Sequence, residues 1–409
     1  MKLGDLNRMV MEDAALRRRQ TLQPVGGKGD KIFPPTFPGK EKGDAPRHVY
    51  EWRGTADRKV WCVLVDSVQS QANRLEESLR AAMSDGAVIP HLLVDFSDTG
   101  LTGLDRITSL DAPHRIYDAI FRDSLLGGKP FMSSEEGQRL AKARPDDASA
   151  LLEMSPSALL FGAWHSTGQG GGLGAKFARC LTSEIMAIDA AVDELLIDEK
   201  TNEVEPRTSA RRTGSRIDPL GILRKVEIYE GESGWATNEK AAGKKAKRVR
   251  PSQINHGNIA PSVEPLGVTC ERLEHTFVLS FAALRRLRFG SEQRNVAARS
   301  MLAALGMLAM AEQDARGYAL RSRCDLVCEG RDPIEVVHMD GSTAAVEVST
   351  ARTRELYDSA RKEAIKAGFE FPADPVRLTP QDKLVEIIRR SQELALAGAG
   401  GDEEVGEES

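Results

Sequence analysis

A glycine cluster within residues 155–189 constrains the fold of this chain more than any other feature of its sequence. The apolar run at residues 158–164 predicts a short buried strand. The glycines after it predict a tight loop, and a helix is expected to begin near Leu173. A loop that leads into a helix N-terminus points several backbone N–H groups at one place, where they can bind an anion. The stretch therefore predicts a phosphate-binding site.

The side chains after Leu173 support the same prediction. Lys176, Arg179 and Ser183 are spaced i, i+3 and i+7, which places them on one face of a helix. The opposite face would carry the apolar residues Phe177, Leu181, Ile185 and Ile188. Two cations near the helix N-terminus would reinforce its dipole. The residues expected to form this phosphate cradle are Ser166, Thr167, Gly170, Gly172, Lys176 and Arg179.

The glycine cluster does not match the two common nucleotide-binding motifs. A P-loop requires Gly-Lys followed by Ser or Thr, whereas Ala175 separates Gly174 from Lys176. The dinucleotide motif requires a third glycine where this chain has Leu173. A nucleotide cofactor site and a plain flexible turn are the alternatives to binding a phosphate backbone.

A second polar helix is expected after the β-branched run at residues 60–65, which itself predicts a buried strand. Ser67 is a suitable N-cap for this helix, and amide and hydroxyl side chains crowd its first turns. Capping and solvent exposure would explain this composition, and so would hydrogen bonds to the sugars and phosphates of a polymer. The residues assigned to such contacts are Ser67, Gln71, Asn73 and Arg74.

The remaining periodicity predicts a mixed α+β protein. Further strands are expected at residues 88–96, 263–268 and 275–282, a possible final strand pair at 325–328 and 335–338, and helices at 133–143, 295–313, 349–367 and 380–396. Residues 201–258 lack this periodicity. They include a segment from Glu239 to Arg250 with six basic residues and one acid, which predicts an insertion outside the core.

The net charge of −5 arises in the acidic C-terminal tail. Residues 402–409 hold five acids and no base, and without them 56 of the 61 acidic residues remain against 56 basic ones. A neutral body is not the charge pattern of a typical nucleic-acid-binding protein, so any phosphate-binding surface has to be local. The tail is expected to be disordered.

Composition also predicts where the protein resides. The N-terminus has no signal-peptide pattern, and the most apolar segment, residues 301–311, is too short to span a bilayer. Five cysteines are an odd number, which favours free thiols in a reducing compartment. We expect a cytoplasmic protein without a membrane partner.

The sequence contains no convincing catalytic or metal-binding group. Cys324 and Cys328 lack the second ligand pair of a zinc site. His165 is followed by Ser166, but adjacent residues on an extended chain point to opposite sides. No metal, no cofactor and no enzymatic activity are expected. The alternatives are a glycine-loop nucleotide hydrolase, a metal-dependent nuclease that uses His165 or His114, and a purely structural scaffold.

Several motifs in series resemble a known family. They are VLVDSVQSQANR at residues 63–74, LDAPHR at 110–115, RDS at 122–124, FGAWHSTG at 161–168 and GLGAKF at 172–177. Their order and spacing resemble the backbone subunit of the type I-G (formerly I-U) CRISPR interference complex, of the Cas "seven" group. The resemblance covers roughly residues 15–395.

The resemblance implies an α+β fold with an RNA-recognition-motif-like (ferredoxin-like) palm that carries thumb and finger insertions. It implies a non-catalytic subunit that polymerises along CRISPR RNA and presents it to target DNA, with further copies of itself and other effector-complex subunits as partners. Lys28 and Lys31 would close over the RNA, and His114, Arg115 and Arg122 would contact it. The expected divisions are an N-terminal loop region at 1–57, palm at 58–200, a basic insertion (candidate thumb or finger) at 201–258, palm and C-terminal helices at 259–397, and the acidic tail at 398–409.

Overall fold

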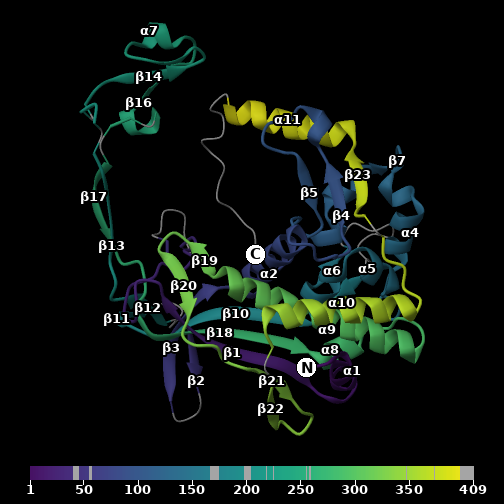
Figure 1. The fold of residues 1–409 in the computed structure, drawn as a ribbon. Coiled ribbons are helices and arrows are strands. Elements are labelled where there is room, and N and C mark those ends of the chain that lie inside the picture. The colour runs from purple at the N-terminus through teal and green to yellow at the C-terminus, as the bar shows by residue number, and fades with distance from the viewer. Residues whose placement is uncertain are drawn as a thin grey trace.

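The protein is a mixed α+β structure built on one long antiparallel sheet (Figure 1). This computed structural model describes residues 1–39, 46–54, 58–165, 175–197, 204–217, 219–223, 225–254, 256–257, 259–346, 348–372 and 374–396. The sheet runs in the order β19-β20-β1-β18-β10-β3-β2, and β21, which pairs with β22, attaches to β1. Its strands are β1 (Ala15–Pro24), β2 (Tyr50–Gly54), β3 (Lys59–Asp66), β10 (Leu181–Ala190), β18 (Cys270–Ser280), β19 (Tyr318–Arg321), β20 (Cys324–Cys328), β21 (Ile334–Val337) and β22 (Thr343–Val346).

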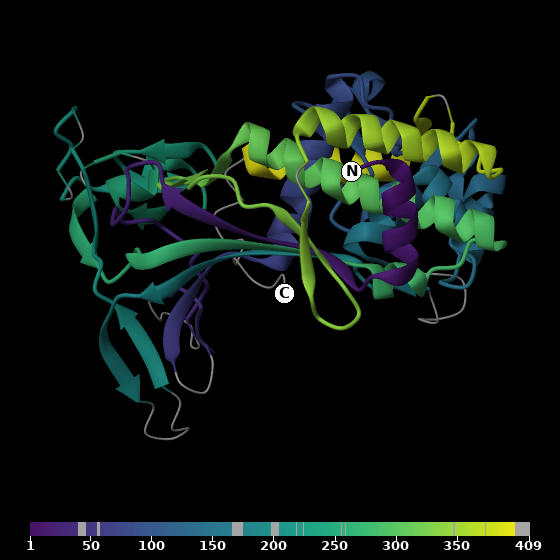
Figure 2. The same ribbon diagram turned by 60° about the horizontal axis from the view of Figure 1, so that its bottom comes forward.

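Helices gather at one end of the molecule (Figure 2), some over one face of this sheet and others against a second, smaller sheet. They are α1 (Leu3–Glu12), α2 (Val68–Ser84), α3 (Ala119–Arg122), α4 (Glu135–Lys142), α5 (Ser149–Met154), α6 (Pro156–Phe161), α8 (Phe281–Arg285), α9 (Glu292–Arg316), α10 (Thr350–Lys366) and α11 (Asp382–Leu396). Shorter 3₁₀ turns are η1 (Ser97–Thr99), η2 (Arg115–Tyr117), η3 (Phe131–Ser133) and η4 (Pro251–Ile254). The expected strand at 60–65 and the helices after Ser67 and at 133–143, 295–313, 349–367 and 380–396 are confirmed, with small shifts at their ends.

The central helix α9 is buried along most of its length between the sheet, α2 and α10. A helix surrounded by protein needs apolar side chains on all sides, which explains its run of Ala, Leu and Met. Gly306 lets it approach the sheet closely, because a Cβ there would lie 2.9 Å from Cδ1 of Leu181 on β10.

The helix expected from Leu173 is wrong, because that segment belongs to the strands β9 (Lys176–Phe177) and β10. Leu181 and Ile185 share a face both on a helix and on a strand, so their spacing alone does not distinguish the two structures. The segment is a strand because β10 forms backbone hydrogen bonds with β18 on one side and with β3 on the other. From Ala175, where the described residues resume, to the end of β10, no helix therefore begins.

The strand expected at residues 158–164 is also wrong. Pro156 starts a short helix, α6, which ends at Phe161, and only β8 (Ala163–Trp164) is extended. Proline suits the first turn of a helix because its missing N–H needs no partner there. The expected final strand pair is likewise corrected: β20 and β21 each pair with β1, and β21 forms its hairpin with β22.

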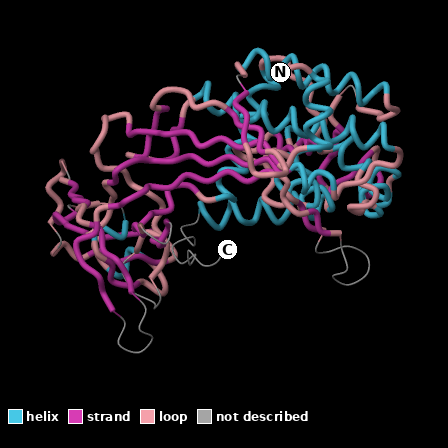
Figure 3. The backbone as a smooth tube through the Cα atoms, turned by 90° about the horizontal axis from the view of Figure 1, so that it is seen from below, coloured by secondary structure: helices cyan, strands magenta, loops and turns pink. Residues whose placement is uncertain are grey.

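Two smaller parts flank the central sheet, and Figure 3 shows the division between a helical end and an end made of strands. A second sheet in the order β5-β4-β23-β6-β7 consists of β4 (Leu92–Asp95), β5 (Arg106–Thr108), β6 (Ser124–Leu126), β7 (Lys129–Pro130) and β23 (Val376–Pro380). An arm between β10 and β18 consists of β11 (Val192–Ile197), β12 (Val204–Thr208), β13 (Arg212–Arg216), β14 (Ile228–Gly231), β15 (Gly234–Ala236), α7 (Glu239–Ala242), β16 (Lys247–Val249) and β17 (Ile259–Glu264). Paired β13 and β17 carry its outer lobe away from the sheet (Figure 1).

Candidate functional site

The predicted glycine loop connects the two strands of a short hairpin. Trp164 on β8 faces Lys176 on β9, and the backbone N–H of His165 donates to the carbonyl of Ala175 at 3.1 Å. The expected cradle residues Ser166, Thr167, Gly170 and Gly172 lie outside the described residues. Trp164, which the sequence analysis placed in a buried strand, is 55% exposed. The Lys176 Nζ lies 5.8 Å from the centroid of its ring.

Arg179 lies beside this hairpin and is held by the backbone. Its Nε donates to the carbonyl of Phe161 at 3.0 Å, and no carboxylate pairs with its guanidinium among the described residues. Burial and the nearby charge of Arg115 lower its pKa. Because Arg115 has a carboxylate partner of its own in Glu76, Arg179 is the guanidinium of this pair that an anion could bind.

Gly162 allows the side chain of Arg179 to lie close against the backbone of the hairpin. Its φ of +86° and ψ of 149° fall in a region that is essentially restricted to glycine. A Cβ at this position would lie 3.0 Å from Cγ of Arg179 and 3.2 Å from the carbonyl oxygen of Phe177.

We therefore expect Gly162→Ala to destabilise the protein by about 1–3 kcal/mol, because it adds strain at a glycine-only conformation. Urea denaturation followed by circular dichroism would measure this loss. Gly4 is a matched control, since a Cβ there meets nothing within 4 Å. An unchanged unfolding midpoint for Gly162→Ala would contradict the prediction.

Arg115 connects α2 to the hairpin. Its Nε and Nη2 donate to Oε1 and Oε2 of Glu76, each at 2.9 Å, and its Nη1 donates to the carbonyl of Gly162 at 3.2 Å. Both partners of the ion pair are buried, and burial raises the pKa of Glu76 to about 7 although Arg115 opposes this. Arg115 also has a φ of +52°, which is unusual for a residue with a side chain. The ion pair thus holds a strained residue beneath the hairpin.

A third cation lies near the same hairpin. The imidazole of His165 is buried and stacks on Tyr117, with the ring centroids 4.7 Å apart and the planes 4° apart. Burial and then the charge of Arg144 lower the pKa of His165. Arg144 is exposed and donates only to the carbonyls of Ala141 and Ala143.

We call Arg144, Trp164, Lys176 and Arg179 the hairpin base. Three of them are cations for which the described residues supply no carboxylate partner. Sequence reasoning identified Lys176 and Arg179 but missed Trp164 and Arg144. Trp164 could have been found from its position directly before a glycine loop, where a hairpin would expose it. Nothing in the sequence around Arg144 indicates its proximity to His165.

Several polar residues in the first turns of α2 are turned toward the buried carboxylate of Asp66. Asp66 is wholly buried and accepts hydrogen bonds from Gln71 Nε2 at 2.7 Å, Arg74 Nε at 2.9 Å and Arg321 Nη2 at 3.1 Å. The hydroxyl of Ser67 caps the helix by accepting from the N–H of Ser70. Of the four residues assigned to RNA on this helix, Asn73 alone is exposed, and the buried side chain of Gln71 is out of reach of a ligand in this structure.

A chain of buried polar groups continues from Gln71. Ser183 donates to Gln71 Oε1 at 3.1 Å and lies 2.5 Å from His275 Nε2. The His275 Nδ1 is 3.1 Å from the hydroxyl of Tyr318, which donates to Asp314 at 2.5 Å. A serine beside a histidine suits nucleophilic catalysis, but the side chains of both Ser183 and His275 are buried here. Ser183 therefore hydrogen-bonds inside the fold and is not on the expected phosphate-binding face.

The other predicted contacts are dispersed. Lys28 forms an ion pair with Glu329, the Lys31 ammonium donates to the carbonyl of Arg211 at 2.5 Å, and Arg122 forms an ion pair with Asp123. His114 is exposed beside Arg115.

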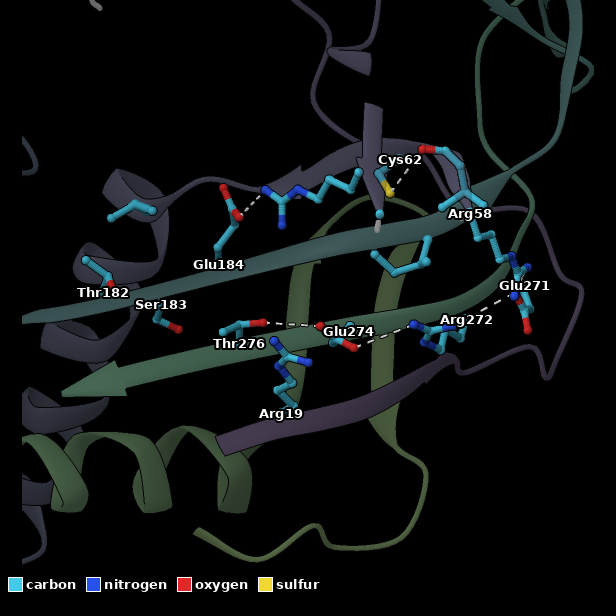
Figure 4. Close-up of a pocket in the computed structure, with 15 residues that line it drawn as sticks. Arg19, Arg58, Cys62, Thr182, Ser183, Glu184, Glu271, Arg272, Glu274 and Thr276 are labelled. Carbon is cyan, nitrogen blue, oxygen red and sulfur yellow. Dashed lines mark hydrogen bonds and ion pairs between the residues drawn. The ribbon is translucent and has the colours of Figure 1, made fainter. Parts of the chain in front are cut away.

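A cavity of about 620 Å³ lies against the central sheet (Figure 4). Its charged lining residues are Arg19, Arg53, Arg58, Glu184, Glu271, Arg272 and Glu274. Most are paired: Arg53 donates to Glu184 at 2.6 Å and Arg58 to Glu271 at 3.3 Å. This near balance of charge suits a polyanion less well than the hairpin base does.

In the part of the chain that the structure describes, no group of three or more His, Cys, Asp or Glu residues could hold a metal ion. None of the helices in this part is long and apolar enough to cross a membrane.

The hairpin base lies in a segment that is similar to a known family. Residues 16–192 match the family model of CRISPR-associated protein GSU0053. The match covers less than half of the chain, from β1 to the start of β11, and supports a CRISPR-associated protein. All four residues of the hairpin base fall within it.

Among solved structures, the crystal structure of Thermofilum pendens Csc2 is similar at 11% sequence identity. The similarity covers 97% of this chain and 81% of that chain, with a TM-score of 0.27, which is too low to assign the fold. No curated protein matches the chain.

Proposed function

We propose that this protein is a non-catalytic subunit of a type I-G CRISPR effector complex that binds CRISPR RNA through its phosphate backbone. The observation that carries the proposal is the hairpin base, which lies in the segment similar to CRISPR-associated protein GSU0053. The residues that the structure describes supply no carboxylate partner for its cations Arg144, Lys176 and Arg179. Unpaired cations around a glycine-rich hairpin suit an extended polyanion whose sequence varies, because phosphate contacts carry no sequence information.

The strand order supports a ferredoxin-like palm. In the order β20-β1-β18-β10 each strand is antiparallel to its neighbour, so β1 runs parallel to β10 and β18 parallel to β20 across one intervening strand. Helix α2 lies in the connection from β1 to β10, and α9 in that from β18 to β20. Two such crossovers give the β-α-β-β-α-β order of that fold, with the β2–β3 hairpin inserted before α2.

Few cations per subunit predict weak binding by one copy. An exposed ion pair at such a surface contributes about 0.2–1 kcal/mol, so tight binding requires many copies along one RNA strand. We propose that copies polymerise along the guide RNA and present it to target DNA together with the other subunits of the complex. The basic outer lobe of the arm is a candidate contact to a neighbouring copy or to nucleic acid.

The test is to express the protein with a CRISPR array and its partner subunits, and to sequence the RNA that co-purifies. We expect guide-length CRISPR RNA with the wild type and much less with Lys176→Gln plus Arg179→Gln. Each lost phosphate contact lowers the slope of log affinity against log salt by about 0.7 for a single strand, so the double variant should lose about 1.4.

Lys362→Gln on α10 is the matched control, because Lys362 is exposed and belongs to another surface. All variants should melt at the wild-type temperature, which separates lost binding from lost folding. Assembled complexes without RNA would overturn the proposal. Turnover of ATP or RNA with Mg²⁺ that a His165 substitution abolishes would favour an enzyme instead.

A further inference from the structure

Trp164 differs from the other exposed tryptophans of the described residues. Trp52, Trp164 and Trp235 are 53%, 55% and 53% exposed. Trp52 packs against Trp61 with their ring centroids 4.1 Å apart. Trp235 makes an edge-to-face contact with His256, with their ring centroids 5.9 Å apart. Trp164 has no aromatic partner among these ring contacts, and the group recorded over its ring is the ammonium of Lys176.

Charge also separates Trp164 from Trp52. Beside Trp52, Arg53 forms ion pairs with Glu51 and Glu184, so the local charge is balanced. Beside Trp164, Lys176 has no carboxylate partner among the described residues, and neither does Arg179, which lies against Phe161 and Gly162 at the start of the same hairpin. An exposed flat ring next to cations without carboxylate partners is the combination that binds single-stranded nucleic acid, since the ring stacks on a base while the cations bind phosphates.

We propose that the indole of Trp164 is a stacking platform for one unpaired nucleobase of an RNA strand. In this arrangement Lys176, which already lies over the ring, binds a phosphate next to that base, and Arg179 binds a phosphate farther along the same strand. The inference rests on the proposed RNA-binding function and adds to it a contact to a base. It predicts no preference among the four bases, because every base presents a π-face to an aromatic ring.

The fixed backbone of the hairpin supports this role. Trp164 is paired across the hairpin with Lys176, and Ala163 with Phe177, whose side chain is buried. The carbonyl of Gly162 next to this pair accepts from Arg115, which Glu76 holds in turn. A ring on a fixed strand loses little conformational freedom when a base stacks on it, which favours binding.

The experiment measures the affinity of the full chain, purified free of RNA, for two probes. One is a single-stranded oligoribonucleotide of mixed sequence, and the other is a backbone of the same length with abasic sites. Stacking on one base predicts that Trp164→Ala weakens binding of the first probe about 5- to 100-fold and leaves that of the abasic probe unchanged. Trp164→Phe should restore most of the affinity, because the phenyl ring also stacks.

Trp52→Ala is the matched control, since it removes an equally exposed tryptophan whose ring already stacks on a neighbour. Quenching of tryptophan fluorescence by the base-containing probe should fall in Trp164→Phe and persist in Trp52→Ala. If Trp164→Ala binds both probes like the wild type while Lys176→Gln plus Arg179→Gln weakens both, the stacking site is wrong and the proposed function stands. If the wild type binds neither probe and its assembled complexes carry no RNA, the proposed function itself fails. If Trp164→Ala loses only a partner subunit, the ring contacts protein and the inference is overturned.

Discussion

Replacing Glu76 with alanine is expected to lower the free energy of unfolding by about 3 kcal/mol, because it leaves a buried guanidinium without its partner. The side chain of Arg115 is 9% exposed and donates twice to Glu76. Arg115 also depends on this ion pair to stay at its positive φ. Urea denaturation at neutral pH would measure the loss.

Glu77→Ala is the matched control, since Glu77 is the next residue of α2 and is exposed. It should change the free energy of unfolding by less than about 0.5 kcal/mol. Arg115→Ala should lower the free energy of unfolding by about as much as Glu76→Ala. The double variant should lower it by much less than the sum of the two, because both single changes break the same ion pair. Additive losses would show that the pair does not couple α2 to the hairpin.

His275 is expected to make the protein sensitive to acid. It is fully buried, and burial together with the charge of Arg18 lowers its pKa from 6.5 to about 3, while Asp314 opposes this shift. Below pH 6.5 the unfolded chain therefore binds a proton at this histidine that the folded protein does not. Stability from this group is present above pH 6.5 and is lost as the pH falls towards 3, by at most about 1.4 kcal/mol per pH unit.

The measurement is urea denaturation at several pH values for the wild type and for His275→Gln. The variant should be less stable at neutral pH because it breaks hydrogen bonds to Ser183 and Tyr318. The difference in free energy of unfolding between the wild type and the variant should shrink as the pH falls, since glutamine takes up no proton in the unfolded chain. His114→Gln, a change at an exposed histidine, is the control and should keep the wild-type profile. Parallel profiles for the wild type and His275→Gln would contradict the prediction.

The central helices and the strand before α2 could be predicted from the sequence, because local patterns determine them. Residues 301–311 are apolar on every side, and only a buried helix accommodates such a run. Ser67 lies at the start of α2 because its hydroxyl satisfies a backbone N–H that the helix leaves free. The order of short motifs likewise indicated a CRISPR-associated protein, and residues 16–192 match such a family.

The candidate site could be predicted only in part. Lys176 and Arg179 were identified for the right chemical reason, as cations beside a glycine loop, but on a helix that does not exist. The polar side of α2 was assigned to RNA, whereas Asp66 draws Gln71 and Arg74 inward. A sequence does not show which of its polar residues meet one another inside the fold.

The sequence by itself determined which segments are apolar, where α2 begins and how many charges the chain carries. The tertiary structure alone decided that residues 181–190 form a strand, because two neighbouring strands satisfy their backbone hydrogen bonds. It alone decided that Glu76 neutralises Arg115, while Lys176 and Arg179 find no carboxylate partner in the described part of the chain. Pairing of charges depends on distances between residues far apart in the chain, and only the folded structure sets these distances.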